Sequence, residues 1–419
     1  MTVLDITSQL TTAPGDSYSA ERALIVSATI VFCLAACSRN EGVIGGDPVS
    51  RDSAGIEIVE NLAPQWVPGR EWRLSDAPVV RIGGLDGEPS YELFRVAGAL
   101  RLSDGRLVIA NAGTHELRFY DGNGAFLHTV GRQGDGPGEF QRLRHVASSG
   151  RDSIAAYDDS HKRVSIFDGA GRYARQVTVR PDGVPRATVR GIFADRTIFG
   201  FDVPFNMPMP TGVVRQDLVL LRISADGRQA DTLGPFPGPE IFAHNEFGFG
   251  MWGLPFGRST YYAIDGNHLY TATSDQYEIR VHDLENHLLR IIRRQHQRAP
   301  VTREMWDRHV DDGSRRPDDE ELEAALRQIY GLMPVPKELP PFTGIHVDVG
   351  GNVWVQQYEA PANIRRRVYD VFAPSGVFLG SVAFPNGFRV LQIGDDFVLG
   401  RSTGEMDEPY VELWELMKG

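Results

Sequence analysis

From Phe94 onward the sequence repeats a unit of about forty residues that contains short segments typical of β-strands. In the first two copies an apolar segment, LVIA or SIAAY, is followed by one that alternates apolar and polar residues, ELRFYD or RVSIFD. Alternation with a period of two is typical of a strand that buries one face. Polar turns such as DGNG and DGAG come next, and such turns join antiparallel strands. A repeated unit of four strands is typical of a β-propeller blade, so we expect an all-β fold.

The two ends of the repeat array predict how the ring closes. PVVRIGGLDGEPSYELF, residues 78–94, is similar to HTVGRQGDGPGEFQRL, residues 128–143, because each has a strand that ends in Gly, then Asp-Gly, Pro, Glu and an aromatic residue. Residues 79–82 therefore have the features of a fourth strand, whereas the last copy, ending at Gly419, contains only three strands. We predict a six-bladed β-propeller over residues 56–419, in which this N-terminal strand closes the last blade and removes exposed sheet edges. The segment from GIEIVEN to EWRLSD is expected outside the ring, as an extra strand or a cap.

Residues 299–341 lack strand signals and predict a small helical insertion between blades four and five. After Pro317, either Asp318 or Asp319 is suited to cap a helix, because a carboxylate there accepts hydrogen bonds from free backbone N–H groups. Apolar residues then recur at helical spacing, namely Leu322, Leu326, Ile329 and Tyr330. A shorter helix is expected over residues 302–310.

The repeat itself resembles a known family. FRVAGALRLSDGRLVIANAGTHELRFYDGNGAFLHTVGRQGDGPGEF is similar to NHL-type repeats. The whole chain resembles the six-bladed β-propeller lipoproteins of the bacterial envelope, best over residues 94–179 and least in the third blade. This resemblance implies the fold, and it implies no activity.

A short apolar segment near the N-terminus, residues 23–34, is interrupted only by Ser27 and Thr29. It is too short to span a bilayer but suits the apolar region of a secretion signal. It leads into Leu-Ala-Ala-Cys, which resembles the bacterial lipoprotein signal, in which the chain is cut before a Cys that is then lipidated. The resemblance implies a signal peptide over residues 1–36, a lipid on Cys37 and a flexible tether over residues 37–55. The alternative is a buried strand or helix that happens to end in Cys.

With this signal, we expect the protein in the bacterial cell envelope, lipid-anchored to a membrane and facing the periplasm or the outer membrane. The net charge of the chain argues against nucleic acid as a partner. The chain carries a net charge of −12, so it repels phosphate backbones, and we expect no nucleic-acid binding. Residues 365–367 form the only basic triplet, and on a strand its side chains would alternate between faces. We also expect a monomer.

The glycine-rich stretch GRQGDGPGEF, residues 131–140, invites three interpretations. A phosphate loop needs a helix after it, but FQRLRHVAS leads into the next strand, and Asp135 and Glu139 would repel phosphate. The spacing of its acidic residues does not match a calcium loop. We interpret the stretch as a connector between blades, in which glycine supplies the positive φ angles of a tight reversal.

An acidic or amide residue also precedes an arginine at a similar place in several blades. The pairs are Asp158 with Arg163, Asp275 with Arg280, and Asn111 with Arg118. They are either ligand groups around the central channel or, as we favour, groups that hold each blade together by ion pairs or turn hydrogen bonds.

The best candidates for partner contact lie in the aromatic-rich segment PFPGPEIFAHNEFGFGMWGLPFG, residues 235–257, which joins blades three and four. They are Phe247, Phe249, Trp252 and Phe256. Exposed aromatic clusters tend to mark recognition sites. The alternative is that the segment packs over its own blade as a small core that includes Phe242.

Known catalytic motifs are absent from the sequence: it has no Gly-x-Ser-x-Gly and no His-Glu-x-x-His. We therefore predict no catalytic residue, no metal ligand and no cofactor, and a binding or scaffold role toward a peptide, glycan or protein partner. The alternative is a propeller hydrolase or lyase with a metal in its central channel, similar to gluconolactonase-like enzymes. The ligands of such a metal come from separate blades, so no sequence spacing tests this alternative.

The lipoprotein interpretation predicts that the protein incorporates a palmitate analogue in growing cells. Replacing Cys37 with Ala should abolish the label, because the thiol is the site of acylation. An unlabelled wild-type protein, or label that persists in Cys37→Ala, would contradict it.

Overall fold

The computed structural model describes residues 46–84, 88–150, 152–204, 210–244, 250–316, 318–358 and 366–419. In these residues the strands form six sheets that are antiparallel apart from one strand pair. Blade one consists of β5 (Val96–Arg101), β6 (Leu107–Asn111), β7 (Glu116–Tyr120) and β8 (Phe126–Val130). Blade two consists of β9 (Leu143–Ser148), β10 (Ile154–Asp158), β11 (Arg163–Phe167) and β12 (Tyr173–Thr178). Blade three consists of β13 (Thr188–Ile192), β14 (Ile198–Asp202), β15 (Gly212–Ile223), β16 (Ala230–His244) and β17 (Gly250–Gly253).

The remaining three blades include all the strands that precede β5. Blade four consists of β18 (Thr260–Ile264), β19 (Leu269–Thr273), β20 (Glu278–His282) and β21 (Leu288–Arg294), with β2 (Ile56–Asn61) and β1 (Val49–Ser53) added. Blade five consists of β22 (Phe342–Val347), β23 (Val353–Gln357), β24 (Arg366–Phe372) and β25 (Phe378–Pro385). Blade six consists of β26 (Arg389–Ile393), β27 (Phe397–Thr403), β28 (Pro409–Met417), β4 (Val80–Gly83) and β3 (Arg73–Leu74).

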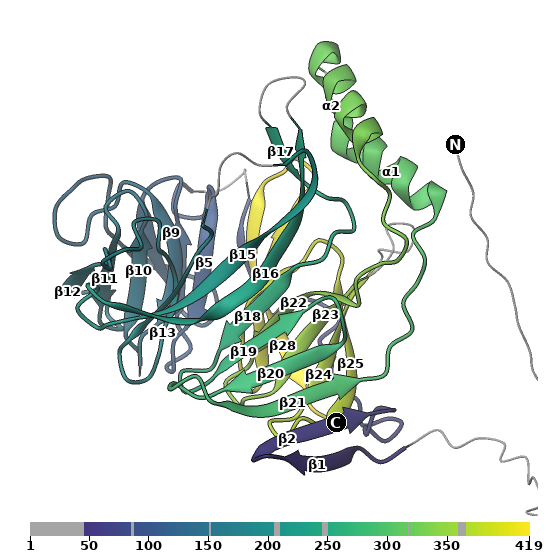
Figure 1. Cartoon of the computed structure of the whole chain (residues 1–419). Coiled ribbons are helices and arrows are strands. Elements are labelled where there is room, and N and C mark those ends of the chain that lie inside the picture. The colour runs from purple at the N-terminus through teal and green to yellow at the C-terminus, as the bar shows by residue number, and fades with distance from the viewer. Residues whose placement is uncertain are drawn as a thin grey trace, which may run out of the picture. The chain divides into compact units, whose positions relative to one another are not determined.

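The first strand of each blade is the inner one, since β5 contacts both β9 and β26, and β18 contacts β22. The predicted six-bladed β-propeller is therefore confirmed (Figure 1). Its core lies between the faces of neighbouring blades. The cluster between blades one and two, for example, contains Val108, Phe119, Phe140, Val146, Ile154 and Phe167.

The ring closes through the N-terminal strand, as the sequence predicts. Strand β4 pairs antiparallel with β28, in a register that places Ile82 opposite Val411 and Val80 opposite Leu413. Val80 and Ile82 are buried and Arg81 is exposed, so the alternation along β4 turns its apolar side chains into the interface with blade one. This pairing supplies the fourth strand that blade six lacks.

The segment before β4 also fastens blade four to blade five. Strand β2 pairs parallel with β21, and β1 pairs antiparallel with β2 on the outside. The buried side chain of Asn61 donates to the carbonyls of Arg293 and Gly376 and accepts from the backbone N–H of Phe378 at 2.8 Å. The expectation of an extra strand outside the ring is met by β2. The expected tether over residues 37–55 is wrong for residues 49–53, because they pair as β1.

The predicted helical insertion lies between β21 and β22 and contains α1 (Arg303–Ser314) and α2 (Glu320–Leu332). Thr302 caps α1 by accepting from the N–H of Met305 at 3.2 Å, and Asp319 caps α2 by accepting from Leu322 at 2.9 Å. Of the two predicted caps, Asp319 is therefore the one used. Helix α1 runs beyond residue 310 to Ser314, whose buried hydroxyl donates to the carbonyl of Val310 within the helix. Across the described residues, neither helix is long and apolar enough to cross a membrane.

Both insertions lie at one end of the ring. A blade-to-blade connector runs from the end of an outer strand to the start of the next inner strand, and in a four-stranded antiparallel blade these ends share one side. The loops between second and third strands lie there too. We call this side the connector face. Because α1, α2 and β17 belong to connectors, they gather on it, as the upper part of Figure 1 shows.

We expect Ile82→Ala to lower the free energy of unfolding by about 2–5 kcal/mol, because Ile82 is 1% exposed at the seam and its loss leaves a cavity. Val79 precedes β4 and is 57% exposed, so Val79→Ala is a matched control that should change stability by less than about 0.5 kcal/mol. Chemical denaturation followed by tryptophan fluorescence measures both. Equal stability of the two variants would show that the seam does not depend on this strand.

Candidate functional site

The residues proposed for partner contact do not form one exposed group in the structure. Phe247 and Phe249 lie outside the described residues, as does the predicted lipidation site Cys37. Phe256 is 5% exposed and its ring lies 6.3 Å from that of Trp306 in α1 and 5.4 Å from that of His309. The proposal of Phe256 as a partner contact is therefore wrong, because its side chain packs beneath the helical insertion.

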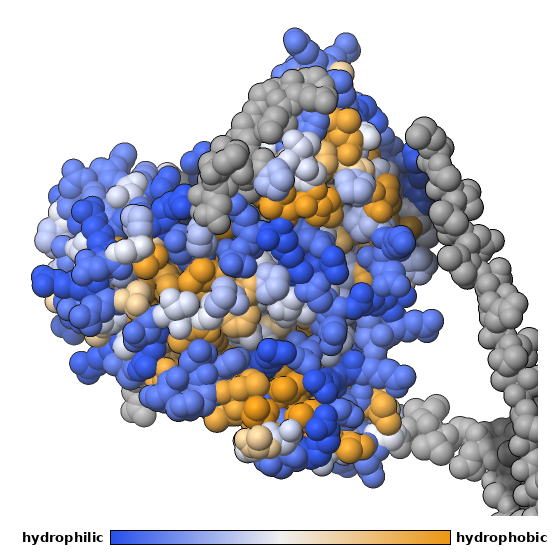
Figure 2. Space-filling view, viewed as in Figure 1, coloured by the Kyte–Doolittle hydropathy of each residue, from blue (hydrophilic) through white to orange (hydrophobic). Residues whose placement is uncertain are grey.

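The described part of this segment does form a small core, but it packs against the helical insertion and not, as the alternative had it, over its own blade. Phe242 and Phe256 belong to one buried cluster with Met305, Trp306, Met333 and Leu339 of the insertion. Trp252 in β17 is half-buried against that cluster, so part of its indole remains accessible. Figure 2 shows hydrophobic residues gathered near β17 and the helices on the viewed face. Trp252 stays a candidate contact.

The glycine-rich stretch at residues 131–140 is a connector held in place by the next blade. The Arg163 guanidinium donates to three backbone carbonyls of the stretch, those of Asp135, Gly136 and Glu139. The fully buried Asp158 carboxylate accepts from the backbone N–H groups of Gln141 and Arg142. The pair therefore clamps the chain as it enters blade two.

The same clamp occurs in blade one with different residues. The Asn111 side chain accepts from the N–H of Phe94 at 2.6 Å, and Arg118 donates to the carbonyls of Pro89 and Glu92. These contacts agree with a structural role for the repeated spacing. Of the two expected kinds of contact, ion pairs or turn hydrogen bonds, these four residues make hydrogen bonds to the backbone of the preceding connector.

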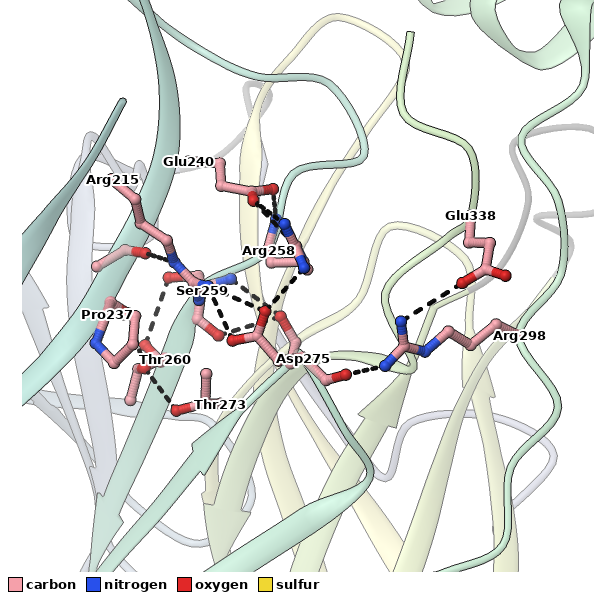
Figure 3. Close-up of polar contacts among 12 residues, drawn as sticks. Arg215, Pro237, Glu240, Arg258, Ser259, Thr260, Thr273, Asp275, Arg298 and Glu338 are labelled. Atoms are coloured by element: carbon pink, nitrogen blue, oxygen red, sulfur yellow. Dashed lines mark hydrogen bonds and ion pairs between the residues drawn. The ribbon is translucent and has the colours of Figure 1, made fainter. Parts of the chain in front are cut away.

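Asp275 departs from this pattern. It does not pair with Arg280; instead its carboxylate lies between Arg215 of β15, at 2.8 Å, and Arg258, at 3.0 Å (Figure 3). Arg258 also contacts Glu240 of β16, and this hydrogen bond raises the pKa of the guanidinium. Asp275 thus joins blade four to the long β15–β16 hairpin of blade three.

The network continues to the helical insertion. Arg298, just before the insertion, donates to the backbone carbonyl of Asp275 and forms an ion pair with Glu338, just after α2 (Figure 3). The Thr260 hydroxyl donates to the carbonyl of Pro237 at 2.8 Å and lies 2.8 Å from the hydroxyl of Thr273. These contacts fix the first residue of the inner strand β18, and with it one wall of the central channel.

Two cavities adjoin this network. The smaller, about 500 Å³, is lined by residues of β16, β19, β20 and β21. Its charged groups neutralise one another, since Glu278 lies 2.8 Å from both Arg280 and Arg293, and these contacts lower the pKa of the Glu278 carboxyl against the effect of burial. The charged side chains of this cavity are therefore already paired, and none of Glu278, Arg280 and Arg293 needs a charged ligand to balance it.

The larger cavity, about 710 Å³, is the central channel. It lies among the inner strands β13, β18, β22 and β26 and includes residues of β23 and β24. Its lining residues are Arg190, Thr260, Tyr261, Tyr262, Thr343, Gly344, Ile345, His346, Gln356, Arg367, Tyr369, Arg389 and Val390. None of these is an aspartate or a glutamate. A volume of this size is typical of a small-molecule site.

The channel wall contains arginines and no carboxylate, and two histidines in or beside it have lowered pKa values. Burial lowers the pKa of His346, in the cavity wall, to about 4. Burial and then the charge of Arg190 lower the pKa of His145, on the neighbouring strand β9, to about 4. Both histidines are therefore neutral near pH 7, and the positive charge of the channel comes from its arginines.

Metal-binding residues do not gather in the described residues: no group of three or more histidine, cysteine, aspartate or glutamate side chains lies close enough to hold an ion. The sequence did not reveal the channel arginines, because each lies in a different repeat and no local spacing connects them.

We expect Asp275→Ala to lower the free energy of unfolding by about 1–3 kcal/mol, because Arg215 and Arg258 would lose their shared carboxylate. It should also speed proteolysis within the helical insertion. Asp311→Ala is the control, since the exposed Asp311–Arg327 pair between the helices contributes less than about 1 kcal/mol. Denaturant titration and limited trypsinolysis measure the two effects, and identical behaviour of the two variants would contradict a role for Asp275 in holding the insertion.

Known proteins resemble the chain in its fold. A family model described as "6-bladed beta-propeller" matches residues 91–180, and no curated protein sequence matches the chain. A solved member of the duf4221 family from Bacteroides vulgatus has a TM-score of 0.51 at 11% identity, over 84% of this chain and 99% of that one. A Bacteroides fragilis protein described as exported has a TM-score of 0.46 at 12% identity, over 86% and 99%. A gluconolactonase from Xanthomonas campestris has a TM-score of 0.41 at 13% identity, over 83% and 99%. At these identities the solved structures bear on the fold alone, and the family description agrees with the six blades that the strand pairing forms.

Proposed function

We propose that this protein is a binding protein of the bacterial cell envelope whose propeller takes its ligand into the central channel from the connector face. The observation that carries the proposal is the cavity of about 710 Å³, which is lined by hydrogen-bonding side chains from four different blades. A pocket with convergent polar groups on a rigid scaffold is the usual form of a ligand site. The insertions lie on the same face, and the network around Asp275 fixes them to blade four.

The location is part of the same proposal. The apolar segment and the Leu-Ala-Ala-Cys sequence that precede the described residues support export and a lipid on Cys37, which would be the membrane contact. Strand β1 begins at Val49, so about ten residues separate Cys37 from the ring. A peptide, a glycan or a segment of another envelope protein are the ligand classes that we propose, and Trp252 is a further contact for such a partner.

The alternative of a metal-dependent hydrolase or lyase fits the described channel poorly. Calcium and magnesium prefer carboxylate and carbonyl oxygens, and zinc takes histidine, cysteine and carboxylate ligands. The cavity wall contributes arginines, tyrosines and one histidine, and arginine side chains repel a cation. The donor set of the cavity therefore favours binding over metal-assisted chemistry.

A variant that fills the channel tests the site. A Cβ added at Gly344 would meet only the Gln356 side chain, at 3.7 and 3.8 Å, and Gly344 lines the cavity, so Gly344→Phe places a ring in the channel with little strain. We expect a panel of peptides and oligosaccharides to contain a ligand that raises the Tm of the wild type but not of Gly344→Phe. Gly331→Phe adds the same ring on α2, where nothing lies within 4 Å, and should respond like the wild type. A Tm shift that survives in Gly344→Phe would place the ligand outside the channel.

A further inference from the structure

The channel concentrates arginines that have no acidic partner. Arg190, Arg367 and Arg389 line the cavity, and Arg401 lies directly opposite Arg389 in the β26–β27 pairing. Three of them donate to backbone carbonyls: Arg190 to Val189, Arg367 to Phe388 and Arg401 to Val96. Arg190 and Arg367 also hydrogen-bond the phenols of Tyr262 and Tyr369, which are neutral partners. Within the described parts of the chain, none of the four forms an ion pair, whereas the arginines of the smaller cavity do.

These arginines are close enough to repel one another. Burial lowers the pKa of Arg401, and the charge of Arg389 lowers it further. Burial raises the pKa of Tyr369 to about 12 although Arg367 and Arg389 oppose the rise, and all three side chains line the same cavity. Arg190, Arg367 and Arg401 are half-buried and Arg389 is exposed, and half-buried like charges cost free energy unless an opposite charge joins them. A protein with a net charge of −12 has many acidic side chains, yet none is present in this cavity wall.

The positions of the arginines indicate how many anionic groups would be held. In a ring of six, blades three and six lie opposite each other, so Arg190 of β13 and Arg389 of β26 approach the channel from opposite sides. Arg367, Arg389 and Arg401 all lie at the connector-face ends of their strands, where a ligand would enter. A guanidinium binds a carboxylate or a phosphate with two parallel hydrogen bonds, and one group cannot occupy both sides of the channel.

The rest of the wall suits the carbon skeleton of a small molecule. Tyr262 and Ile345 supply apolar surface, and Gln356 supplies an amide. The buried hydroxyl of Thr343, also in the wall, has no hydrogen-bond partner. A buried polar group without a partner costs free energy, and a ligand oxygen in the cavity would satisfy it.

We propose that the central channel binds a small organic anion with at least two oxyanion groups, carboxylate or phosphate, held between Arg190 on one side and Arg367 and Arg389 on the other. This proposal rests on the channel site of the proposed function, and it assigns a small anion to that site in place of a peptide, a glycan or a protein segment. Carboxylate and phosphate both present oxyanions to a guanidinium, and the experiment below distinguishes which of the two the channel binds.

Isothermal titration calorimetry of the whole propeller at fixed ionic strength tests the proposal, with citrate and pyrophosphate as probes and the trimethyl ester of citrate as the neutral control. We expect citrate or pyrophosphate to bind at millimolar concentration or below and the ester not to bind. Binding of citrate alone identifies carboxylate as the ligand chemistry, and binding of pyrophosphate alone identifies phosphate. Failure of both probes would overturn the proposal.

Matched variants locate the binding. Arg389→Gln removes an exposed guanidinium at the start of β26 and should weaken binding of the probe at least tenfold. Arg303→Gln removes the same charge from an exposed position in α1 and should leave the affinity unchanged, so equal weakening by the two variants would indicate only a general charge effect. Circular dichroism confirms that both variants are folded.

The failure of this proposal is distinguishable from failure of the channel as a binding site. A neutral ligand whose Tm shift is abolished by Gly344→Phe but unaffected by Arg389→Gln would retain the channel site and overturn its anion specificity. Anion binding that persists in Gly344→Phe would overturn the assignment of that binding to the channel.

Discussion

The pairing of β4 with β28 is the contact on which the ring depends. The C-terminal part of the chain supplies only three strands of blade six, which would leave β28 as an open sheet edge, and open edges invite pairing with other chains. Here the join is made by hydrogen bonds between residues more than three hundred positions apart in sequence, and by Ile82, which is buried against blade one. Every inner strand takes its place around the channel from that closure.

The channel shows how the constraint of the ring produces a site. Each blade contributes one inner strand, so the wall of the cavity is assembled from short segments with no common sequence pattern. The four arginines come from β13, β24, β26 and β27, and only their convergence gives them a shared property. Clamps such as Arg163 and Arg118 secure the connectors from blade to blade, and the Asp275 network secures the insertions. Polar contacts therefore fix the connectors and insertions of the connector face, while apolar contacts between neighbouring blades form the core beneath that face.

The sequence predicts the fold well and the site poorly, for one physical reason. Strand alternation, hairpin turns and the helix cap at Asp319, one of two candidates, are local signals, and the displaced strand at residues 79–82 is visible because its connector is similar to another one. Packing of side chains is not local. Phe256 reads as an exposed aromatic residue, but it is buried because α1 from the next connector lies over it. From the sequence, residues 365–367 are a basic triplet whose side chains alternate between faces and form no patch. Arg367 becomes part of a basic group only because Arg389 of the next blade lines the same cavity.

The strap formed by residues 49–83 touches three successive blades: β2 lies along blade four, the backbone N–H groups of Gln65 and Trp66 donate to blade five, and β4 completes blade six. Mechanical tension applied to the chain before Val49 would therefore be borne first by β1 and β2. These strands can detach from the edge of blade four without breaking any of the four strands that build that blade. The seam lies some twenty residues further on, behind the contacts to blade five, so a pull on the N-terminal side would have to peel the strap before it could open the ring.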